Sequence, residues 1–201
     1  MVSQFSFFRD VDEDAVRLEG FRYQQDLIAP AVEEALVKRV RELPFQEFEF
    51  HGYKGKRRVV SFGWKYEFSG GGQLRKADEI PEFLLDLRSL ATSFAAVEPD
   101  AFQHVLVTEY GPGAGIGWHR DKAVFGEVVG VSLLAPCMLR FRRKVNSKWD
   151  RVNVLAKPRS AYHLKGPARS EWEHSILRVD ALRYSITFRT LPDPQSASTA
   201  I

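Results

Sequence analysis

The second half of the chain is a succession of short extended segments with no helix-length stretch between them. Gly, Pro or Asn residues separate these segments from one another. Parallel strands need long crossover connections, which this pattern lacks, so the strands are predicted to pair antiparallel in a sandwich or jelly roll. The expected strands are His104–Tyr110, Gly126–Leu134, Met138–Arg142, Arg151–Ala156, Ser160–Leu164, Ser175–Val179 and Leu182–Arg189.

Two segments in the first half have helical periodicity. Apolar residues recur at helical spacing in Pro30–Leu43 and in Pro81–Val97, and each segment begins with a proline, which suits a first helical turn. We expect both helices to pack on the sheet. Between them, Arg58–Phe68 is expected to form a β-hairpin at the sheet edge. The chain is therefore predicted to be an α+β protein in which two or more N-terminal helices support a β-rich second half.

The length of 201 residues suits a single domain. We expect residues of about 1–100 to hold the helices and the hairpin, and residues of about 101–190 to form the β core. Residues 191–201, rich in Pro, Ser, Ala and Thr, are expected to be a disordered tail. The 29 Lys and Arg residues exceed the 26 Asp and Glu residues by only three, which permits nucleic-acid binding without favouring it.

The chain lacks the marks of a membrane or secreted protein. No stretch approaches the roughly 20 apolar residues that span a bilayer, and the first residues do not show a secretory pattern. Cys137 is the only cysteine, so no intrachain disulfide can form, and its apolar neighbours predict a small buried core residue. We expect a cytoplasmic monomer with no membrane partner.

A His-x-Asp motif, His119-Arg120-Asp121, follows the glycine-rich loop Gly111–Gly117. Residues two apart in an extended segment project to the same face, so His119 and Asp121 can bind one ion together. His174, at the start of a later expected strand, supplies a second imidazole. Two His and one carboxylate leave three positions open, as non-haem Fe(II) oxygenases require. The sequence thus predicts a catalytic Fe(II) site at His119, Asp121 and His174.

The competing interpretation is three unrelated polar residues near turns. The remaining histidines have no comparable partner and are expected to be structural; they are His51, His104 and His163.

The last expected strand carries an arginine at each end. Alternation places Arg183, Ser185, Thr187 and Arg189 on one face, where two arginines inside a barrel would need anionic partners. At about 3.3 Å per residue, their Cα atoms lie about 20 Å apart, so the side chains must lean together to grip one small dicarboxylate. 2-Oxoglutarate is such a molecule, and the planar guanidinium suits its carboxylates. The alternative is an edge strand with both arginines solvated.

Several motifs between residues 104 and 189 occur together in one order. They are Val105–Tyr110 followed by Gly111-Pro112-Gly113, His119-Arg120-Asp121-Lys122, Ser132-Leu133, Trp172–Ile176 and Arg183–Arg189. In this order and spacing they resemble the AlkB family of Fe(II)- and 2-oxoglutarate-dependent dioxygenases. The resemblance implies a double-stranded β-helix, or jelly-roll, core supported by N-terminal helices. It also implies that Tyr110 and Arg183 hold one carboxylate of 2-oxoglutarate, with Arg189 near the other and Thr108 and Ser185 assisting.

The chain departs from the family pattern at three positions. Thr108 and Ser185 stand where the best-known members have Asn, but both keep a side chain that forms hydrogen bonds. Ala123 stands where well-studied repair members carry an acidic residue that touches the target base. This last departure bears on the substrate and leaves the chemistry unaffected.

Family members cover the iron with an N-terminal lid that reads the nucleotide. The corresponding region here is Phe50–Arg58, with four cations in Lys54–Arg58, followed by the aromatic segment Phe62–Tyr66. Cations beside aromatic rings suit phosphates and an extruded base. The expected substrate contacts are Tyr53, Arg57, Arg58, Trp64 and Tyr66. The alternative is a solvated basic turn before an amphipathic hairpin.

A second basic run alternates along an expected strand and into a hairpin. It comprises Arg140, Arg142, Arg143, Lys144 and Lys148. It is interpreted either as lining the same groove as the lid or as an ordinary exposed face.

The predicted activity is oxidative demethylation of N-alkylated bases in nucleic acid, as in DNA repair, with O2 consumed and formaldehyde, succinate and CO2 released. Because no wedge residue for opening a duplex is evident, single-stranded substrates are expected to be preferred. One alternative keeps the chemistry but acts on a protein side chain or a small molecule, as Ala123 suggests. Another is a non-catalytic jelly-roll module that binds nucleic acid.

Overall fold

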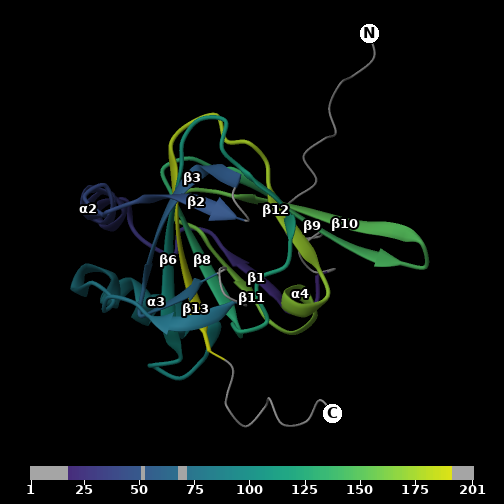
Figure 1. Cartoon of the computed structure of the whole chain (residues 1–201), viewed down its shortest axis with the longest axis horizontal. Helices are drawn as coiled ribbons and strands as arrows, with labels where there is room; N and C mark the ends of the chain where they lie inside the picture. Colours follow the sequence, from purple (N-terminus) through teal and green to yellow (C-terminus); the bar gives the residue numbers. More distant parts are fainter. Residues whose placement is uncertain (1–17, 51–52, 68–71, 192–201) are drawn as a thin grey trace.

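The computed structural model describes residues 18–50, 53–67 and 72–191, and two antiparallel sheets dominate it (Figure 1). The larger sheet has seven strands in the order β1-β11-β8-β13-β6-β3-β2. The smaller sheet has four strands in the order β10-β9-β12-β7, and β4 and β5 form a separate pair. The bounds are β1 Phe21–Gln24, β2 Gln46–Phe50, β3 Tyr53–Phe62, β4 Trp64–Glu67, β5 Gln73–Lys76, β6 Phe102–Tyr110, β7 Ile116–His119, β8 Val128–Leu133, β9 Cys137–Val145, β10 Lys148–Ala156, β11 Ala161–Leu164, β12 Glu173–Ile176 and β13 Arg183–Thr190.

Strands from β6 to β13 are shared between the two sheets. β6, β8, β11 and β13 belong to the larger sheet, and β7, β9, β10 and β12 belong to the smaller one. The chain therefore crosses repeatedly from one sheet to the other, which gives a double-stranded β-helix with supporting helices. The predicted α+β jelly-roll fold is confirmed.

Two helices cover one face of the larger sheet. They are α2 (Pro30–Val40) and α3 (Leu85–Ala95), and α3 is preceded by the 3-10 turn η1 (Glu82–Leu84). Both helices begin near a proline, and their apolar stripes pack against the outward-facing residues of β6, β8 and β13. The packed sheet residues include Val105, Val107, Val129, Val131, Ile186 and Phe188. None of the described helices is long and apolar enough to cross a membrane.

A second core fills the space between the two sheets. Leu139, Phe141 and Ile176 from the smaller sheet pack with Tyr110 and Tyr162 from the larger one. Cys137 belongs to this core and is buried, as its apolar neighbours predict. This core supports the inner faces of both sheets, on which the candidate site is built.

The expected hairpin over Arg58–Phe68 is wrong. β3 pairs with β2 and β6, whereas β4 pairs with β5, so the two segments do not pair with each other. Gly63 separates them: its φ is +73°, and a Cβ there would lie 2.1 Å from the backbone oxygen of Gln103. Glycine permits this turn at the point where the chain leaves the larger sheet. Phe68 itself lies outside the described residues.

Other predictions need smaller corrections or remain open. The helices do not simply precede the strands, because β1 to β5 lie among them and β1 extends the edge of the larger sheet beside β11. The expected tail lies outside the described residues, apart from Leu191. The single-domain organisation, the monomeric state and the cytoplasmic location stay predictions.

Candidate metal and co-substrate site

The three predicted metal ligands lie together at the junction of β7 and β12. His119 and His174 are directly opposite each other in this antiparallel pair, with ring centroids 4.3 Å apart. Asp121 follows His119 by two residues, and one potential ligand atom from each residue lies within 4.8 Å of the others. The side chains of His174 and Asp121 are only 14% and 11% exposed. This donor set fits one divalent cation with positions left for other ligands.

Neighbouring groups orient these donors. Nδ1 of His119 lies 2.9 Å from the carbonyl oxygen of Gly117, and a proton donated there leaves Nε2 free for an ion. Arg189 donates from Nη2 to Oδ1 of Asp121 at 3.2 Å. The other carboxylate oxygen, Oδ2, lies 3.8 Å from Nε2 of His174. Each donor is therefore held with one atom directed toward the others.

The electrostatic environment keeps these groups in the protonation states that bind a cation. The pKa of His174 is lowered to about 4 by burial together with His119, Arg189 and Arg169, while Asp121 opposes the shift. Burial alone would raise the pKa of Asp121, but the charges of Arg189, His174, Arg169 and His119 together lower it. At neutral pH the imidazole of His174 is neutral and Asp121 is ionised, as metal binding requires.

Arg183 forms the other end of the site and is completely buried. Its Nη2 donates to Oγ of Ser132 at 2.8 Å, and its guanidinium lies 4.9 Å from the ring centroid of Tyr110. Within the described part of the chain, Nε and Nη1 of Arg183 have no hydrogen-bond partner. A buried guanidinium with two unused donors requires an anionic ligand, and a carboxylate fits it.

The other expected co-substrate residues share the inner face of the larger sheet. Thr108 and Ser185 are buried and directly opposite each other in the β6–β13 pair. Burial raises the pKa of the Tyr110 hydroxyl, although Arg183 and Arg57 oppose this. Tyr110 therefore stays protonated at neutral pH and can donate a hydrogen bond.

The two arginines of β13 have different partners. Arg183 is held by Ser132, whereas Arg189 lies against Asp121 and 3.5 Å from Nδ1 of His104. Nε of Arg189 is a buried donor without a partner among the described residues. Arg189 thus lies beside the candidate metal ligand Asp121, and Arg183 lies farther along the same strand.

Arg169 was not predicted from the sequence. It lies in the short helix α4 (Gly166–Ser170) and donates to four backbone carbonyls of the loop that follows the His-x-Asp motif. These acceptors are the carbonyl oxygens of Asp121, Lys122, Phe125 and Gly126, at 2.6 to 3.3 Å. Arg169 therefore fixes the loop on which Asp121 lies. Its acceptors belong to the backbone, so no pattern of side chains could have indicated this role.

The expected lid residues divide between the two faces of β3. Arg57 lies directly across from Tyr110, and Arg58 directly across from Glu109. Arg57 shares the inner face with Tyr110, and burial lowers its pKa. Arg58 lies on the opposite face and forms an ion pair with Glu109 at 2.7 Å. Of these two cations, Arg57 is the one directed toward the candidate site.

The aromatic lid residues lie on β4 or at the start of β3. The Tyr66 ring centroid lies 5.3 Å from Nζ of Lys122, so β4 contacts the residue that follows Asp121 in the sequence. Trp64 is two residues from Tyr66 on the same half-exposed strand. Tyr53 begins β3, but its side chain lies outside the description.

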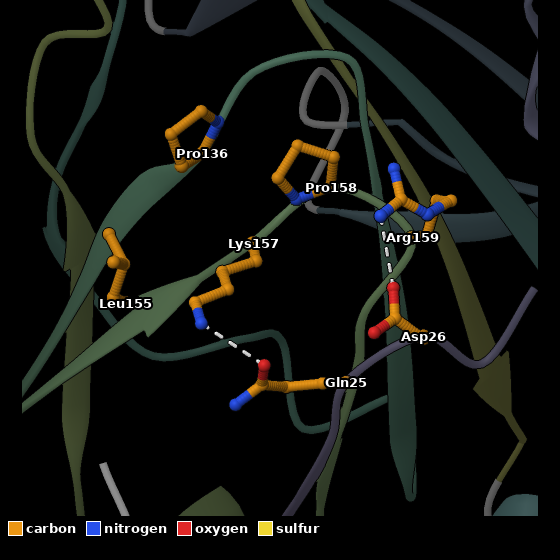
Figure 2. A pocket seen from close by; sticks show the side chains of 7 residues that line it. All are labelled: Gln25, Asp26, Pro136, Leu155, Lys157, Pro158 and Arg159. Carbon is orange, nitrogen blue, oxygen red and sulfur yellow. Dashed lines mark hydrogen bonds and ion pairs between the residues drawn. The ribbon is translucent and has the colours of Figure 1, made fainter. Parts of the chain in front are cut away.

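A surface hollow of about 440 Å³ lies elsewhere on the molecule (Figure 2). Its cations are paired: Arg159 contacts Asp26 at 3.0 Å, and Lys157 donates to Gln25 at 3.1 Å. None of the candidate metal or co-substrate residues lines it.

Residues 20–189 match the 2OG-Fe(II) oxygenase superfamily. The chain belongs to this superfamily. It is therefore a dioxygenase that uses Fe(II), 2-oxoglutarate and O2, and the predicted enzyme class and cofactors are confirmed. The donors clustered around His174 and Arg183 fit both groups.

Curated relatives include an uncharacterized protein, L905, of Acanthamoeba polyphaga mimivirus, 25% identical over 88% of this chain and 87% of that protein. An Arabidopsis thaliana protein named as an alkylated DNA repair protein, ALKBH8 homolog, is 28% identical over 60% of this chain and 42% of its own length. The second of these similarities agrees with the AlkB resemblance of the sequence motifs.

Solved structures share the fold at low sequence identity. OsALKBH1 matches 85% of this chain and 98% of its own, with a TM-score of 0.64 and 16% identity. A Pseudomonas putida prolyl-4-hydroxylase matches 90% of this chain and 97% of its own, with a TM-score of 0.57 and 14% identity.

Proposed function

We propose that this dioxygenase demethylates N-alkylated bases in nucleic acid, with release of formaldehyde, succinate and CO2. The observation that carries the proposal is the contact between the Tyr66 ring and the ammonium group of Lys122, the residue that follows the candidate metal ligand Asp121. An extruded base can stack on such a ring while its phosphate meets the cation. The similarity to a protein named for alkylated DNA repair supports the same substrate class.

In this proposal His119, Asp121 and His174 bind the iron. Fe(II) bound there would supply O2 activation coupled to the oxidative decarboxylation of 2-oxoglutarate. Gly117 orients His119 through its carbonyl oxygen, and Arg189 orients Asp121. The low exposure of Asp121 and His174 limits the access of water to the reacting atoms.

Arg183 and Tyr110 bind one carboxylate of 2-oxoglutarate in this proposal. The unused donors of Arg183 supply the charge-assisted hydrogen bonds, and Ser132 holds the guanidinium in place. Thr108 and Ser185 offer hydroxyl groups on the same inner face. Arg189 lies near the end of the co-substrate that approaches the metal.

The substrate side is formed by β3 and β4. Arg57 on the inner face, with Trp64 and Tyr66, would contact the nucleotide whose base enters the site. The contacts of Tyr53 and Arg58 with a substrate stay predictions. Single-stranded nucleic acid is the expected form, because flipping a base out of a duplex costs a few kcal/mol.

A panel of N-methylated single-stranded DNA, RNA and peptides tests the proposal. Formaldehyde and succinate should form in equal amounts with a methylated oligonucleotide and not with its unmethylated form. A methylated or hydroxylatable peptide that stimulates turnover while every oligonucleotide fails would move the activity to a protein side chain. That outcome would give weight to Ala123, the departure from the repair members.

A further inference from the structure

The outer face of the smaller sheet carries three residues of the second basic run: Arg140, Arg142 and Lys144. Side chains alternate along β9, so Leu139 and Phe141 join the inner core while Arg140, Arg142 and Lys144 face outward. His174 lies on the inner side next to Phe141. These three cations therefore lie on the far side of the smaller sheet from the candidate metal ligands and do not line their groove.

Two tryptophans and two arginines form an ordered stack on this outer face. The Arg142 guanidinium lies 4.4 Å from the Trp118 ring centroid and 4.3 Å from that of Trp149. Arg140 lies 4.8 Å from the Trp118 centroid and donates to Oγ of Ser175 at 3.1 Å. Trp149 remains 40% exposed, so part of its ring is available to a partner.

The β9–β10 hairpin extends this face away from the rest of the molecule (Figure 1). Lys144 lies opposite Trp149, and Arg142 lies opposite Arg151. The turn at Asn146 and Ser147 has positive φ at both residues, as in the tight hairpin turns that match the twist of the strands. The hairpin is therefore a preformed platform.

The platform has an excess of positive charge. Of the outward-facing residues on the four described strands, Arg140, Arg142, Lys144 and Arg151 are cationic, and Glu173 alone is acidic. Glu173 is engaged by Nε of Arg142 at 2.7 Å. Among the described residues, no ion pair is formed by Arg140, Lys144 or Arg151. With four cations and one carboxylate, this sheet face has a formal net charge of +3, the same as that of the whole chain.

We propose that this platform, defined by Trp118, Arg140, Arg142, Lys144, Trp149 and Arg151, binds single-stranded nucleic acid outside the target nucleotide. The unpaired cations suit successive phosphates, and the exposed ring of Trp149 suits a stacked base. An acidic peptide would satisfy the charges, but it has no flat groups to match the tryptophan. The inference rests on the proposed nucleic-acid substrate and assigns that substrate a second contact area.

The geometry of β7 connects the platform to the site. β7 is the edge strand of the smaller sheet, and Trp118 and His119 are neighbours on it. Trp118 faces the outer arginines, while His119 faces His174 on the inner side. A nucleic-acid strand bound on the platform would reach the candidate metal ligands by passing around the edge of the smaller sheet that β7 forms.

Binding of unmodified oligonucleotide tests the platform separately from catalysis. The probe is fluorescein-labelled single-stranded oligo(dT) or oligo(U), titrated with Mn(II)-loaded protein at several salt concentrations and followed by anisotropy. The variants are Lys144→Gln/Arg151→Gln and Trp149→Ala, whose side chains are exposed. Lys38→Gln/Arg39→Gln on the exposed face of α2 is the matched control.

The double variant should bind about tenfold more weakly, and the slope of log affinity against log salt should fall by about 1.4, since each phosphate contact contributes about 0.7. Trp149→Ala should weaken binding between about fivefold and a hundredfold, the range for loss of one base–aromatic stack. The α2 control should bind as the parent does. Demethylation of a methylated trinucleotide, too short to reach the platform, should be unchanged in every variant.

Parent-like affinity and salt slope in both platform variants would overturn the inference while leaving the proposed function in place. Equally tight binding of an oligoglutamate would also overturn it, because the face would then be a general anion surface. If the variants lose oligonucleotide binding but no methylated oligonucleotide stimulates turnover, the platform stands and the proposed demethylation fails.

Discussion

Arg189 holds Asp121 by one carboxylate oxygen, at 3.2 Å, and leaves the other oxygen facing His174. The arginine lies on β13 in the larger sheet, and Asp121 follows β7 of the smaller one. The carboxylate of the candidate metal site is thus fixed by a contact between the two sheets.

Replacing His174 by Ala should abolish 2-oxoglutarate turnover, because only one imidazole and one carboxylate would remain for the ion. Succinate release measures turnover, and Mn(II) titration followed by electron paramagnetic resonance measures the loss of metal binding. The circular dichroism spectrum should match that of the parent. His163→Asn removes a buried histidine outside the site and should keep Mn(II) binding. Normal turnover in His174→Ala would show that the ligand set is wrong.

Arg183→Ala should weaken binding of N-oxalylglycine, the unreactive amide analogue of 2-oxoglutarate, by about 2–5 kcal/mol, because a desolvated carboxylate would lose its partner. Arg183→Lys should be almost as damaging, since an ammonium group cannot form two parallel hydrogen bonds. Ser132→Ala, which removes only the support of the guanidinium, should cost about 1 kcal/mol. Calorimetric titration measures all three. Unchanged affinity in Arg183→Ala would remove this arginine from the co-substrate site.

Arg169→Ala should destabilise the protein by about 2 kcal/mol, because backbone carbonyls of the Asp121–Gly126 loop would lose a charged donor. For a chain of this size the loss corresponds to a fall in Tm of roughly 4–8 °C. Mn(II) affinity should fall as well, since the loop carries Asp121. Arg75→Ala, which removes a mostly exposed arginine paired with Glu67, should change the free energy of unfolding by less than about 1 kcal/mol. Equal effects of the two substitutions would refute the loop-holding role.

Arg57→Gln and Arg58→Gln should differ, because the two cations lie on opposite faces of β3. Arg57→Gln should raise the KM for 2-oxoglutarate or for a methylated oligonucleotide, since Arg57 faces Tyr110 in the candidate site. Arg58→Gln loses an ion pair with Glu109 and should have the smaller effect on either KM. Steady-state kinetics with each substrate varied in turn distinguishes them. A larger effect from Arg58→Gln would place the substrate on the other face of the sheet.

The metal-free protein should lose stability as the pH falls below about 6.5, the ordinary pKa of histidine. Burial and the charge of Arg189 lower the pKa of His104, with Asp121 opposing. Burial, with Lys165 and Arg22, also lowers the pKa of His163, although Glu127 opposes this.

Each of these histidines binds a proton more weakly in the folded chain than in the unfolded chain. Their contribution is therefore complete above about pH 6.5 and falls as the pH drops toward the folded pKa values. Urea unfolding at pH 7.5, 6.5 and 5.5 measures the slope, and His104→Asn should reduce it. A flat profile, or greater stability at lower pH, would contradict the assignment.

The sequence predicted that the candidate metal ligands lie together, because their convergence depends on simple periodicity. A spacing of two in an extended segment is sufficient to place His119 and Asp121 on one face, and a histidine in a neighbouring strand completes the set. The alternation in β13 likewise predicted the inward faces of Arg183 and Arg189. These features follow from strand geometry, which local sequence determines.

Features that depend on the pairing of distant segments were not predictable in the same way. The turn at Gly63 depends on the carbonyl oxygen of Gln103, and no pattern near Gly63 indicates that contact. Which of Arg57 and Arg58 faces the candidate site could be decided only from the register of β3 against β6. Arg169 contacts backbone atoms, which are the same in every residue, so the identity of its partners could not be read from their side chains.

The pairing of β7 with β12 limits how the chain before His119 can change. His119 pairs with His174 but Ile116 pairs with Ile176, so β7 contains one extra residue between these points. Residues three apart in a regular strand face opposite sides, so this extra residue is what lets His119 and Ile116 both face the inner side of the smaller sheet. A chain of the same length that paired regularly onward from Ile116 would turn His119 to the outer face. Changes between Ile116 and His119 that favour regular pairing would therefore be expected to yield a folded protein that has lost one candidate metal ligand.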